Sequence, residues 1–270
     1  MADVSIIIVN YNTGELLSNA LKSIAGSITV DFEAIVIDNC SGDNSFELSS
    51  ELMENPRFTF IQAGENIGFA KANNIAAEAS TGRILHFLNP DTEVSASLNE
   101  DYLYALAHSE TVYVNPLVNP NGSLENDIMP VPYLKNLLLW NFCRRSAEIW
   151  YKGASVIISR ENFYKIGGWS NEYFLYAEDL DLFHKINLAG VPIASLSSVI
   201  YHFGGGSSSR LWSRLERAKI VERSNRIFYR KFFGMAEYHF VKLYYLVHNL
   251  IKHPKILPVY LKSWMQSGND

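Results

Sequence analysis

The stretch ILHFLNPD, residues 84–91, decides the fold class of this chain. A short run of mostly apolar residues ends in an amide, a proline and a carboxylate, which is typical of a strand buried on both faces of a parallel sheet. Ligands of such sheets bind beyond the carboxyl ends of the strands. We therefore expect Asn89 and Asp91 to lie at the edge of a cleft.

Three further apolar runs predict strands of the same kind. They cover residues 4–10, 32–38 and 58–62. A helix is expected from Asn12 onward, because a Glu follows three positions later at the spacing of a capping box. The alanine-rich residues 68–79 predict another helix. Strands that alternate with helices in this way predict an α/β domain with a mostly parallel central sheet.

The second half of the chain is less regular. Residues 115–132 are rich in Asn and Pro and predict loops. Beyond them we expect short strands and helices at 152–159, 161–166, 179–189, 191–194 and 199–201, and two longer helices at 210–233 and 238–251. The chain is therefore predicted to form one α/β domain over residues 1–209, followed by a C-terminal basic, aromatic-rich helical region over residues 210–270.

The composition fits a globular protein with a large core. Hydrophobic residues make up 48% of the chain and charged residues 19%, which excludes a disordered chain. We expect neither a signal peptide nor a membrane-spanning helix, because the first residues lack a basic segment and no apolar run reaches about 18 residues. Cys40 and Cys143 are far apart and predict neither a disulfide framework nor a zinc motif. These features favour a cytoplasmic protein.

The net charge of −5 hides an uneven distribution. Residues 210–270 contain 12 Lys or Arg and 4 Asp or Glu, a balance of +8, whereas residues 1–209 carry a balance of −13. Aromatic side chains such as Trp212, Phe240 and Trp264 lie among the basic ones. A basic amphipathic helix with aromatic residues fits the surface of an anionic membrane. The alternatives are a helical subdomain that covers the rest of the protein and a contact in a homodimer.

The usual nucleotide-binding motifs are missing. The first strand is not followed by Gly-x-Gly-x-x-Gly, and the chain has no Walker-type Gly-x-x-x-x-Gly-Lys, so a dinucleotide-binding or P-loop protein loses its main support. No feature predicts a nucleic-acid partner. A base and ribose could instead be bound by side chains at the first two strand ends, where Asp38 could accept hydrogen bonds from hydroxyl or imino groups. The alternative is that Asp38 and Asp43 only shape a turn.

Asn89-Pro90-Asp91 could hold a metal ion. A hard divalent cation prefers oxygen ligands and often bridges a carboxylate and two phosphates. Such a cation would stabilise the charge that develops on a leaving diphosphate. The alternative is that Asp91 caps a helix after a proline turn.

Two later features could complete a catalytic site. Glu178 and Asp179 are adjacent carboxylates that repel each other, so one of them is expected to have a shifted pKa or a bound cation nearby. A carboxylate at this place could act as a general base. They could also merely stabilise a helix N-terminus. His202 follows a predicted strand and precedes the Gly- and Ser-rich residues 204–209. Imidazole is a common metal ligand, and the flexible run could cover phosphates or serve as a linker.

The order of these motifs carries more information than any one of them. VNYN (9–12), VIDN (36–39), NIGFA (66–70) and LNPD (88–91) are followed by GA (153–154), GGW (167–169) with Glu172, YAEDLD (176–181), and His202 ahead of glycines and serines. As an ordered set over residues 4–210, they closely resemble the family 2 glycosyltransferases. Within that family the chain looks most like the bacterial rhamnosyltransferase-type branch.

The resemblance implies the GT-A fold of nucleotide-diphospho-sugar transferases, a catalytic domain over residues 1–209, and an inverting transfer that depends on Mg²⁺ or Mn²⁺. Asp91 would be the main metal ligand and His202 the second, while Asp179 would be the catalytic base, with Glu178 as the other candidate. The nucleotide sugar would be bound by Asn10, Tyr11, Asn12, Asp38, Asn66, Gly68, Lys71, Asn89, Asp91, Gly153 and Ala154.

Two positions depart from the pattern of the wider family. Asn89 stands where the wider family usually has the first Asp of Asp-x-Asp, a substitution that looks common in this branch. Trp169-Ser170-Asn171 replaces the more usual Phe-Asp and leaves the acceptor geometry open.

The expected reaction takes a sugar from a nucleotide diphosphate to a saccharide or lipid-linked saccharide acceptor in cell-surface polysaccharide synthesis. The donor could be dTDP-L-rhamnose, a UDP-hexose or UDP-galactofuranose. The expected location is the cytoplasm or the inner face of the cell membrane. A non-catalytic nucleotide-sugar binding protein is one alternative, although it should have lost Asp91, His202 or the carboxylate pair. A nucleotidyltransferase is another, and it would release pyrophosphate.

Overall fold

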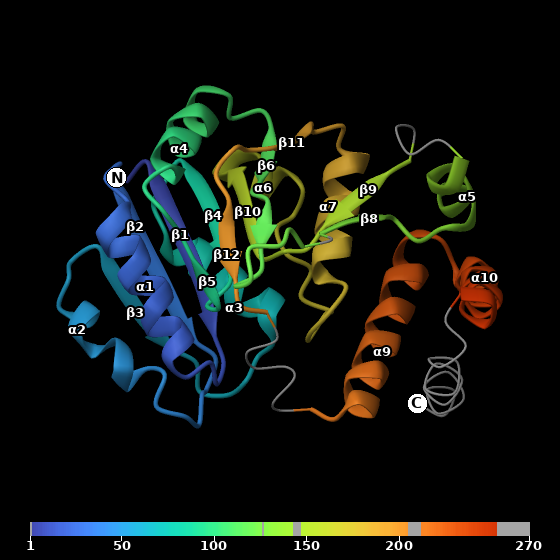
Figure 1. The fold of residues 1–270 in the computed structure, drawn as a ribbon, viewed down its shortest axis with the longest axis horizontal. Coiled ribbons are helices and arrows are strands. Elements are labelled where there is room, and N and C mark those ends of the chain that lie inside the picture. Colours follow the sequence, from blue (N-terminus) through green and yellow to red (C-terminus); the bar gives the residue numbers. More distant parts are fainter. Residues whose placement is uncertain (1, 126, 143–146, 205–211, 253–270) are drawn as a thin grey trace.

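A seven-stranded sheet forms the centre of the protein, in the order β11-β6-β10-β4-β1-β2-β3 (Figure 1). The computed structural model describes residues 2–125, 127–142, 147–204 and 212–252. The strands are β1 Val4–Asn10, β2 Phe32–Asp38, β3 Phe58–Gln62, β4 Ile84–Leu88, β6 Val112–Val114, β10 Ser155–Ser159 and β11 Ile193–Ser195. Only β10 runs antiparallel to its neighbours in this sheet, so the predicted mostly parallel sheet is confirmed.

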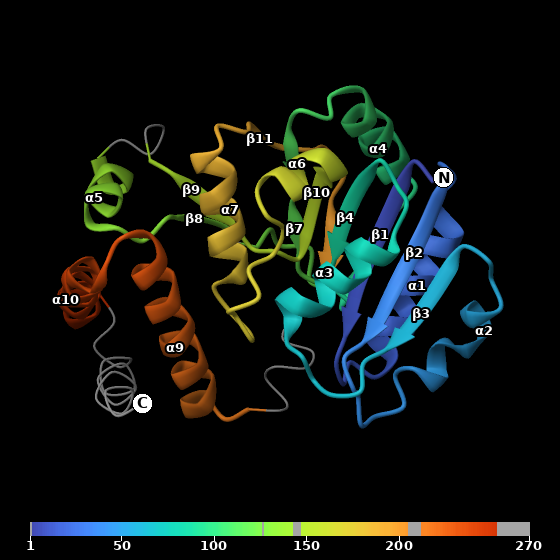
Figure 2. The same ribbon diagram turned by 180° about the vertical axis from the view of Figure 1, so that it is seen from behind.

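Helices cover both faces of this sheet, as Figures 1 and 2 show from opposite sides. Ile6 and Ile8 of β1 pack in one cluster with α1 and α4, whereas Ile7 and Val9 pack in another with α3, α6 and α7. Alternate side chains of a strand point to opposite faces, so β1 is buried on both. The helices are α1 Glu15–Ser27, α2 Ser50–Met53, α3 Phe69–Ala79, α4 Leu98–Ala107, α6 Arg160–Lys165 and α7 Glu178–Leu188, and a 3₁₀ turn, η1, covers Glu47–Ser49.

A small second sheet of β5, β12 and β7 lies beside the main one. β12 (Ile200–His202) pairs antiparallel with β5 (Thr92–Glu93) and parallel with β7 (Leu117–Val118). This pairing places His202 opposite Thr92, one residue after Asp91. Two segments that are far apart in sequence therefore meet at the end of β4.

The segment 115–132 was expected to be loops, and this prediction is wrong in part. It contains β7 and also β8 (Ile128–Pro130), which forms an antiparallel hairpin with β9 (Ile149–Tyr151). In the sequence, helix α5 (Leu134–Phe142) follows β8 and precedes β9. Strands of two or three residues are too short to show a period in the sequence, which is why they were missed.

The C-terminal helices α9 (Arg214–Phe232) and α10 (Met235–Lys252) pack on the rest of the protein. A third hydrophobic cluster joins Phe228 and Tyr238 of these helices to Tyr173 and Leu180. Figure 1 shows α9 and α10 at the end of the molecule opposite β3. Within residues 2–252, apart from the gaps at 126, 143–146 and 205–211, no helix is both long and apolar enough to cross a bilayer.

The predicted start of α1 needs correction. The helix begins at Glu15 with Gly14 as its N-cap, and no side chain caps it. Asn12 instead has a left-handed backbone, φ 53°, and its Oδ1 accepts a hydrogen bond of 2.7 Å from the amide of Gly42. The side chain thus joins the loop after β2, so it does not form the expected capping box. Cys143 and most of the predicted loop 204–209 lie outside the described residues.

Candidate active site

A cavity of about 800 Å³ opens beyond the carboxyl ends of β1, β2 and β4. Its wall is completed by the start of α7, by the β8–β9 hairpin and by α9 and α10. The predicted site residues that line it are Tyr11, Asn66, Gly68, Asn89, Asp91, Gly153, Ala154, Glu178, Asp179 and His202. The structure therefore brings the polar strand ends and the later acidic motif into one cavity.

Four of the predicted nucleotide-binding residues do not line this cavity. Asn10 is fully buried, and its amide donates hydrogen bonds of 2.7 Å to Asp38 Oδ1 and 2.8 Å to Ser45 Oγ. Asn10 and Asp38 thus form a buried support beneath the strand ends. Asn12 lies in the neighbouring loop, and Lys71 is exposed on α3. A direct contact of these four residues with a nucleotide stays a prediction.

Asn39 and Asn66 form the floor of one end of the cavity. Asn39 Nδ2 donates to Asn66 Oδ1 over 2.9 Å, and Asn39 Oδ1 accepts from the amide of Ile67 over 2.9 Å. Gly68 follows with φ 85°, and a Cβ at this position would lie 2.7 Å from Phe174 O. Only glycine fits this close approach. Asn39 was not predicted as a site residue, although it directly follows Asp38 in the VIDN motif.

Asp91 and His202 meet at the end of β4. His202 Nε2 lies 3.4 Å from Asp91 Oδ1, and His202 Nδ1 lies 2.8 Å from Glu125 Oε1. Glu125 Oε2 in turn accepts a hydrogen bond of 2.8 Å from Lys152 Nζ. The sequence analysis missed Glu125 and Lys152. Glu125 comes from the irregular segment 115–132, where no motif marks it.

The charges around His202 keep its imidazole oriented. Burial alone would lower the pKa of His202, but the hydrogen bonds and negative charges of Asp91 and Glu125 outweigh burial and raise it. Burial would raise the pKa of Glu125, but Lys152 and His202 lower it. Carboxylates that bind the second nitrogen of a metal-ligating His fix its tautomer and ring orientation. Glu125 has this relation to His202.

Asp91 and His202 fit a metal site in which the protein supplies only some of the ligands. Among the described residues, no group of three or more His, Cys, Asp and Glu side chains could hold a metal ion. The protein would supply one carboxylate oxygen and one imidazole nitrogen. Mg²⁺ is typically bound through one or two carboxylates together with substrate phosphates and water. The donor set therefore suits a cation that binds together with a diphosphate.

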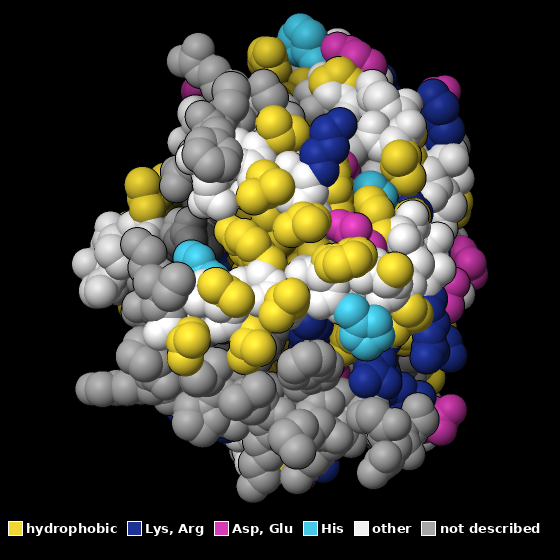
Figure 3. Space-filling model, turned by 90° about the vertical axis from the view of Figure 1, so that its right-hand side faces the viewer, with side chains coloured by type: hydrophobic (Ala, Val, Ile, Leu, Met, Phe, Trp, Pro, Cys, Tyr) yellow, Lys and Arg dark blue, Asp and Glu magenta, His cyan; other side chains and the backbone are white. Residues whose placement is uncertain are grey.

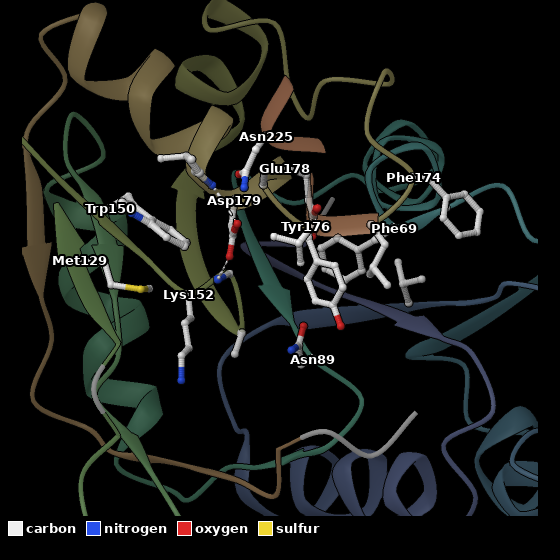
Figure 4. Close-up of a pocket in the computed structure, with 18 of the residues that line it drawn as sticks. Phe69, Asn89, Met129, Trp150, Lys152, Phe174, Tyr176, Glu178, Asp179 and Asn225 are labelled. Atoms are coloured by element: carbon white, nitrogen blue, oxygen red, sulfur yellow. Dashed lines mark hydrogen bonds between the residues drawn. The ribbon is translucent and has the colours of Figure 1, made fainter. Parts of the chain in front are cut away.

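Glu178 and Asp179 begin α7 after two residues in the left-handed region, Tyr176 (φ 68°) and Ala177 (φ 62°). Asp179 Oδ1 accepts a hydrogen bond of 2.8 Å from its neighbour's amide, Leu180 N, and Oδ2 accepts one of 3.3 Å from Gly153 N. Two backbone amides thus hold its two oxygens. Figure 4 shows Asp179 between the two ends of the cavity.

Both adjacent carboxyl groups have raised pKa values, whereas a shift was expected of one of them. Burial raises the pKa of Asp179 to about 6 against the opposing effect of its amide hydrogen bonds. Burial, and next the negative charge of Asp179, raises the pKa of Glu178 to about 8. Glu178 Oε2 is buried and finds no hydrogen-bond partner among the described residues. Because backbone amides donate hydrogen bonds to both oxygens of Asp179, this carboxyl is the more readily ionised of the two, as suits a general base.

The sequence also matches the model of a known family. The sequence model described as Glycosyl transferase family 2 matches residues 5–170, more than half of the chain. The chain belongs to glycosyl transferase family 2. The family and the glycosyltransferase class that were predicted from the sequence are thus confirmed, whereas the rhamnosyltransferase branch is not.

Relatives of this glycosyltransferase carry names from glycan synthesis. It is 26% identical over 220 residues to the low-salt glycan biosynthesis hexosyltransferase Agl10 of Haloferax volcanii, covering 73% of this chain and 66% of that protein. It is 23% identical over 261 residues to a poly-beta-1,6-N-acetyl-D-glucosamine synthase of Staphylococcus aureus, covering 92% and 61%. The chain thus spans about two thirds or less of the length of these relatives.

Two solved structures confirm the predicted GT-A fold. The structure of GalNAc-T7 with UDP, GalNAc and Mn²⁺ superposes with a TM-score of 0.61 at 17% identity, over 85% of this chain and 50% of that one. The structure of S. aureus TarS gives a TM-score of 0.58 at 19% identity, over 86% and 44%. At such identities the likeness concerns the fold alone.

Proposed function

We propose that this family 2 glycosyltransferase transfers a sugar from a nucleotide diphosphate to an acceptor hydroxyl with inversion of configuration. One observation carries the proposal: Asp179 lines the same cavity as the Asp91–His202 pair. A general base and a site for a diphosphate-bound cation thus border one space. The retention of all these groups argues against a non-catalytic binding protein.

The proposed mechanism uses Asp179 as the group that touches the acceptor. Its carboxylate accepts the proton of the acceptor hydroxyl. The hydroxyl oxygen of the acceptor then attacks the anomeric carbon from the face opposite the leaving nucleoside diphosphate. The amides of Leu180 and Gly153 orient the carboxylate. The base and ribose would lie over Tyr11, Asn39 and Asn66 at the other end of the cavity. Asn10 and Asp38 would support them from beneath.

Mg²⁺ or Mn²⁺ would be held by Asp91 and His202. When bound, the cation would stabilise the negative charge that develops on the leaving diphosphate. Asn89, which directly follows β4, would add a polar side chain next to Asp91. Glu125 would keep His202 Nε2 turned toward Asp91.

The donor is proposed to be dTDP-L-rhamnose, with UDP-hexoses and UDP-galactofuranose as the alternatives. A thermal-shift screen of these nucleotide sugars with Mg²⁺ or Mn²⁺ tests the proposal. We expect one nucleotide to raise the unfolding temperature and a chelator to abolish the rise. Turnover should release a nucleoside diphosphate. Release of pyrophosphate from a nucleoside triphosphate would instead identify a nucleotidyltransferase and overturn the proposal.

The acceptor is proposed to be a saccharide or lipid-linked saccharide in cell-surface polysaccharide synthesis, in line with the names of the relatives. Residues 1–209 would act as the catalytic domain, and α9 and α10 would cover its acceptor end. The outer face of α10 carries exposed apolar side chains at Phe240, Leu243, Val247 and Leu250. Figure 3 views this side of the molecule and shows hydrophobic side chains gathered across its middle.

We propose that this outer face contacts the inner surface of the cell membrane. The region 210–270 has a balance of +8, which suits an anionic surface. A homodimer that buries the same face is the alternative.

A further inference from the structure

Helix α10 is apolar on two opposite faces. Tyr238, Val241 and Tyr245 follow one another at helical spacing and line the cavity. The exposed Leu243 and Val247 lie on the other side of the helix. Packing against the rest of a protein needs one apolar face of a helix, so a second apolar face indicates a second apolar contact. The inner face therefore needs an explanation of its own, apart from the outer face.

The inner face borders the end of the cavity that lies away from the proposed nucleotide site. In Figure 4, Met129 and Trp150 lie on one side of Asp179, whereas Phe69 and Tyr176 lie on the other. We call the end next to Met129 and Trp150 the far end. Trp150 packs in one hydrophobic cluster with Tyr238, Val241 and Tyr245, so the inner face of α10 belongs to this end.

Three polar groups at the far end are already bonded within the protein. Trp150 Nε1 donates to Pro130 O over 3.2 Å, and the hydroxyl of Tyr229 donates to Pro132 O. The hydroxyl of Tyr238 accepts from Arg226 Nε over 3.4 Å. A sugar placed against these groups would leave hydroxyl groups without hydrogen-bond partners, and burial of an unsatisfied polar group is unfavourable. A hydrocarbon group would carry no such cost.

The far end also carries a positive charge. Lys242, which lines the cavity, contacts Glu222 Oε2, and Arg226 Nε lies 3.8 Å from Glu222 Oε1. Two cations thus share one carboxylate across α9 and α10. Of these three side chains, Lys242 lines the cavity, so its ammonium group favours an occupant with an anionic group next to its hydrocarbon part.

We propose that the far end binds the hydrocarbon chain of a lipid phosphate that carries the acceptor sugar. The sugar would then reach Asp179 while the chain lies between the β8–β9 hairpin and the inner face of α10. This proposal rests on the proposed function, because Asp179 has to be the base for the arrangement to have meaning. It adds that the lipid part of the acceptor is recognised within the cavity.

The experiment measures the binding of decyl phosphate and glycerol phosphate to the full chain by calorimetry, below the concentration at which decyl phosphate forms micelles. We expect decyl phosphate to bind at least tenfold more tightly. Shorter alkyl phosphates should bind progressively more weakly, since each buried methylene group adds to the affinity. Equal affinity for decyl and glycerol phosphate would overturn the proposal.

Adjacent residues on one strand supply a matched pair of variants. Met129 lines the far end, whereas Ile128 is exposed and does not. Met129→Glu should weaken decyl phosphate binding at least tenfold, and Ile128→Glu should leave it unchanged. Leu243→Glu on the outer face of α10 should also leave it unchanged. Loss of binding in Leu243→Glu but not in Met129→Glu would place the ligand on the outer surface and overturn the proposal.

Nucleotide-sugar binding, followed by thermal shift in the same variants, separates the two proposals. All variants should keep it, which shows that they are folded. A protein that binds a nucleotide sugar but not decyl phosphate would overturn only the lipid site. A protein that binds neither would contradict the proposed function as well.

Discussion

At the residue scale, Asp179 and Glu178 are adjacent but differently placed. Asp179 accepts two backbone hydrogen bonds, whereas the buried Glu178 Oε2 accepts none among the described residues. Asp179→Asn should therefore lower kcat by about 10²–10⁴-fold, the range for loss of a general base. Glu178→Gln should lower it less than about tenfold. Donor binding, followed by thermal shift, should persist in both, and near-normal turnover of Asp179→Asn would refute the assignment.

The same residue sets the pH dependence of the reaction. Because the base must be ionised to accept a proton, the rate is lost as the pH falls through its pKa. Burial raises the pKa of Asp179 to about 6, so kcat should fall about tenfold per unit below that pH. A pH–rate profile of the wild-type enzyme with saturating donor measures this. An acidic limb with an apparent pKa near 4, the ordinary value of an Asp side chain, would mean that the base is not buried as described.

Glu125 is predicted to tune the metal through His202. Loss of a carboxylate that orients a ligating His typically costs about 10–100-fold in metal affinity. Glu125→Gln should weaken Mn²⁺ binding by this amount in the presence of a nucleoside diphosphate, as measured by electron paramagnetic resonance. Glu51→Gln, on an exposed turn of α2, is the matched control and should change nothing. Unchanged Mn²⁺ affinity in Glu125→Gln would remove His202 from the metal site.

The sequence predicted the site residues with uneven success. Asp91, Asp179 and His202 were expected to act together, and the structure lines one cavity with all three. Asp38 was expected to touch the nucleotide; it is buried and accepts a hydrogen bond from Asn10, and its contact with a nucleotide stays a prediction. A motif records which residues lie at a strand end, but the direction of each side chain depends on packing that the motif does not contain.

At the scale of elements, the early strands were predicted to the residue. The predicted ranges 4–10, 32–38, 58–62 and 84–88 coincide with β1, β2, β3 and β4. Strands buried on both faces are nearly continuous apolar runs, which polar residues end sharply. The helices α4 and α5 and the strands β6 and β9 were not predicted. Strands of three residues lack a readable period, and their positions are set by partners far away in the sequence.

The third acid of the motif links α7 to α9. Asp181 is fully buried and accepts hydrogen bonds of 2.5 Å from Ser170 Oγ and 2.8 Å from Lys231 Nζ. Lys231→Met should therefore lower the free energy of unfolding by about 1.5–3 kcal/mol, the range for a hydrogen bond to a charged group. Urea unfolding measures this. Lys219→Met, at an exposed position of the same helix, should cost less than about 0.5 kcal/mol.

A double-mutant cycle tests the link directly. If Lys231 acts through Asp181, the combination of Lys231→Met with Asp181→Asn should cost less than the sum of the two single changes. Additive costs would mean that Lys231 stabilises α9 in another way.

At the scale of the whole molecule, the uneven charge of the chain had two readings. The structure packs α9 and α10 on Tyr173 and Leu180, so the described part of the basic region does cover the body of the protein. Composition could not decide between this packing and a membrane contact, because the same aromatic and basic residues serve either. Packing on the protein and a membrane contact are compatible, because one face of α10 lines the cavity and the other is exposed.

The outer face of α10 should bind anionic membranes. Leu243 and Val247 are 54% and 48% exposed, so burial of the remaining surface in a bilayer interface contributes about half of the 1.5–3 kcal/mol for a fully exposed side chain, roughly 0.8–1.5 kcal/mol each. The double variant Leu243→Asp, Val247→Asp should therefore lose at least about tenfold in affinity for phosphatidylglycerol vesicles, as measured by co-sedimentation. Added salt should weaken the wild type, because it screens the basic residues.

A matched control separates this effect from a general loss of surface hydrophobicity. Leu103 and Leu188 are 59% and 67% exposed and lie on α4 and α7. Leu103→Asp, Leu188→Asp should bind vesicles as the wild type does. Sedimentation velocity of the same proteins tests the alternative, a homodimer. If the wild type is a dimer, the α10 variant is a monomer and neither binds vesicles, a second copy of this chain covers the face. The membrane proposal would then be wrong, because one apolar face of α10 cannot be buried against both a bilayer and a partner at once.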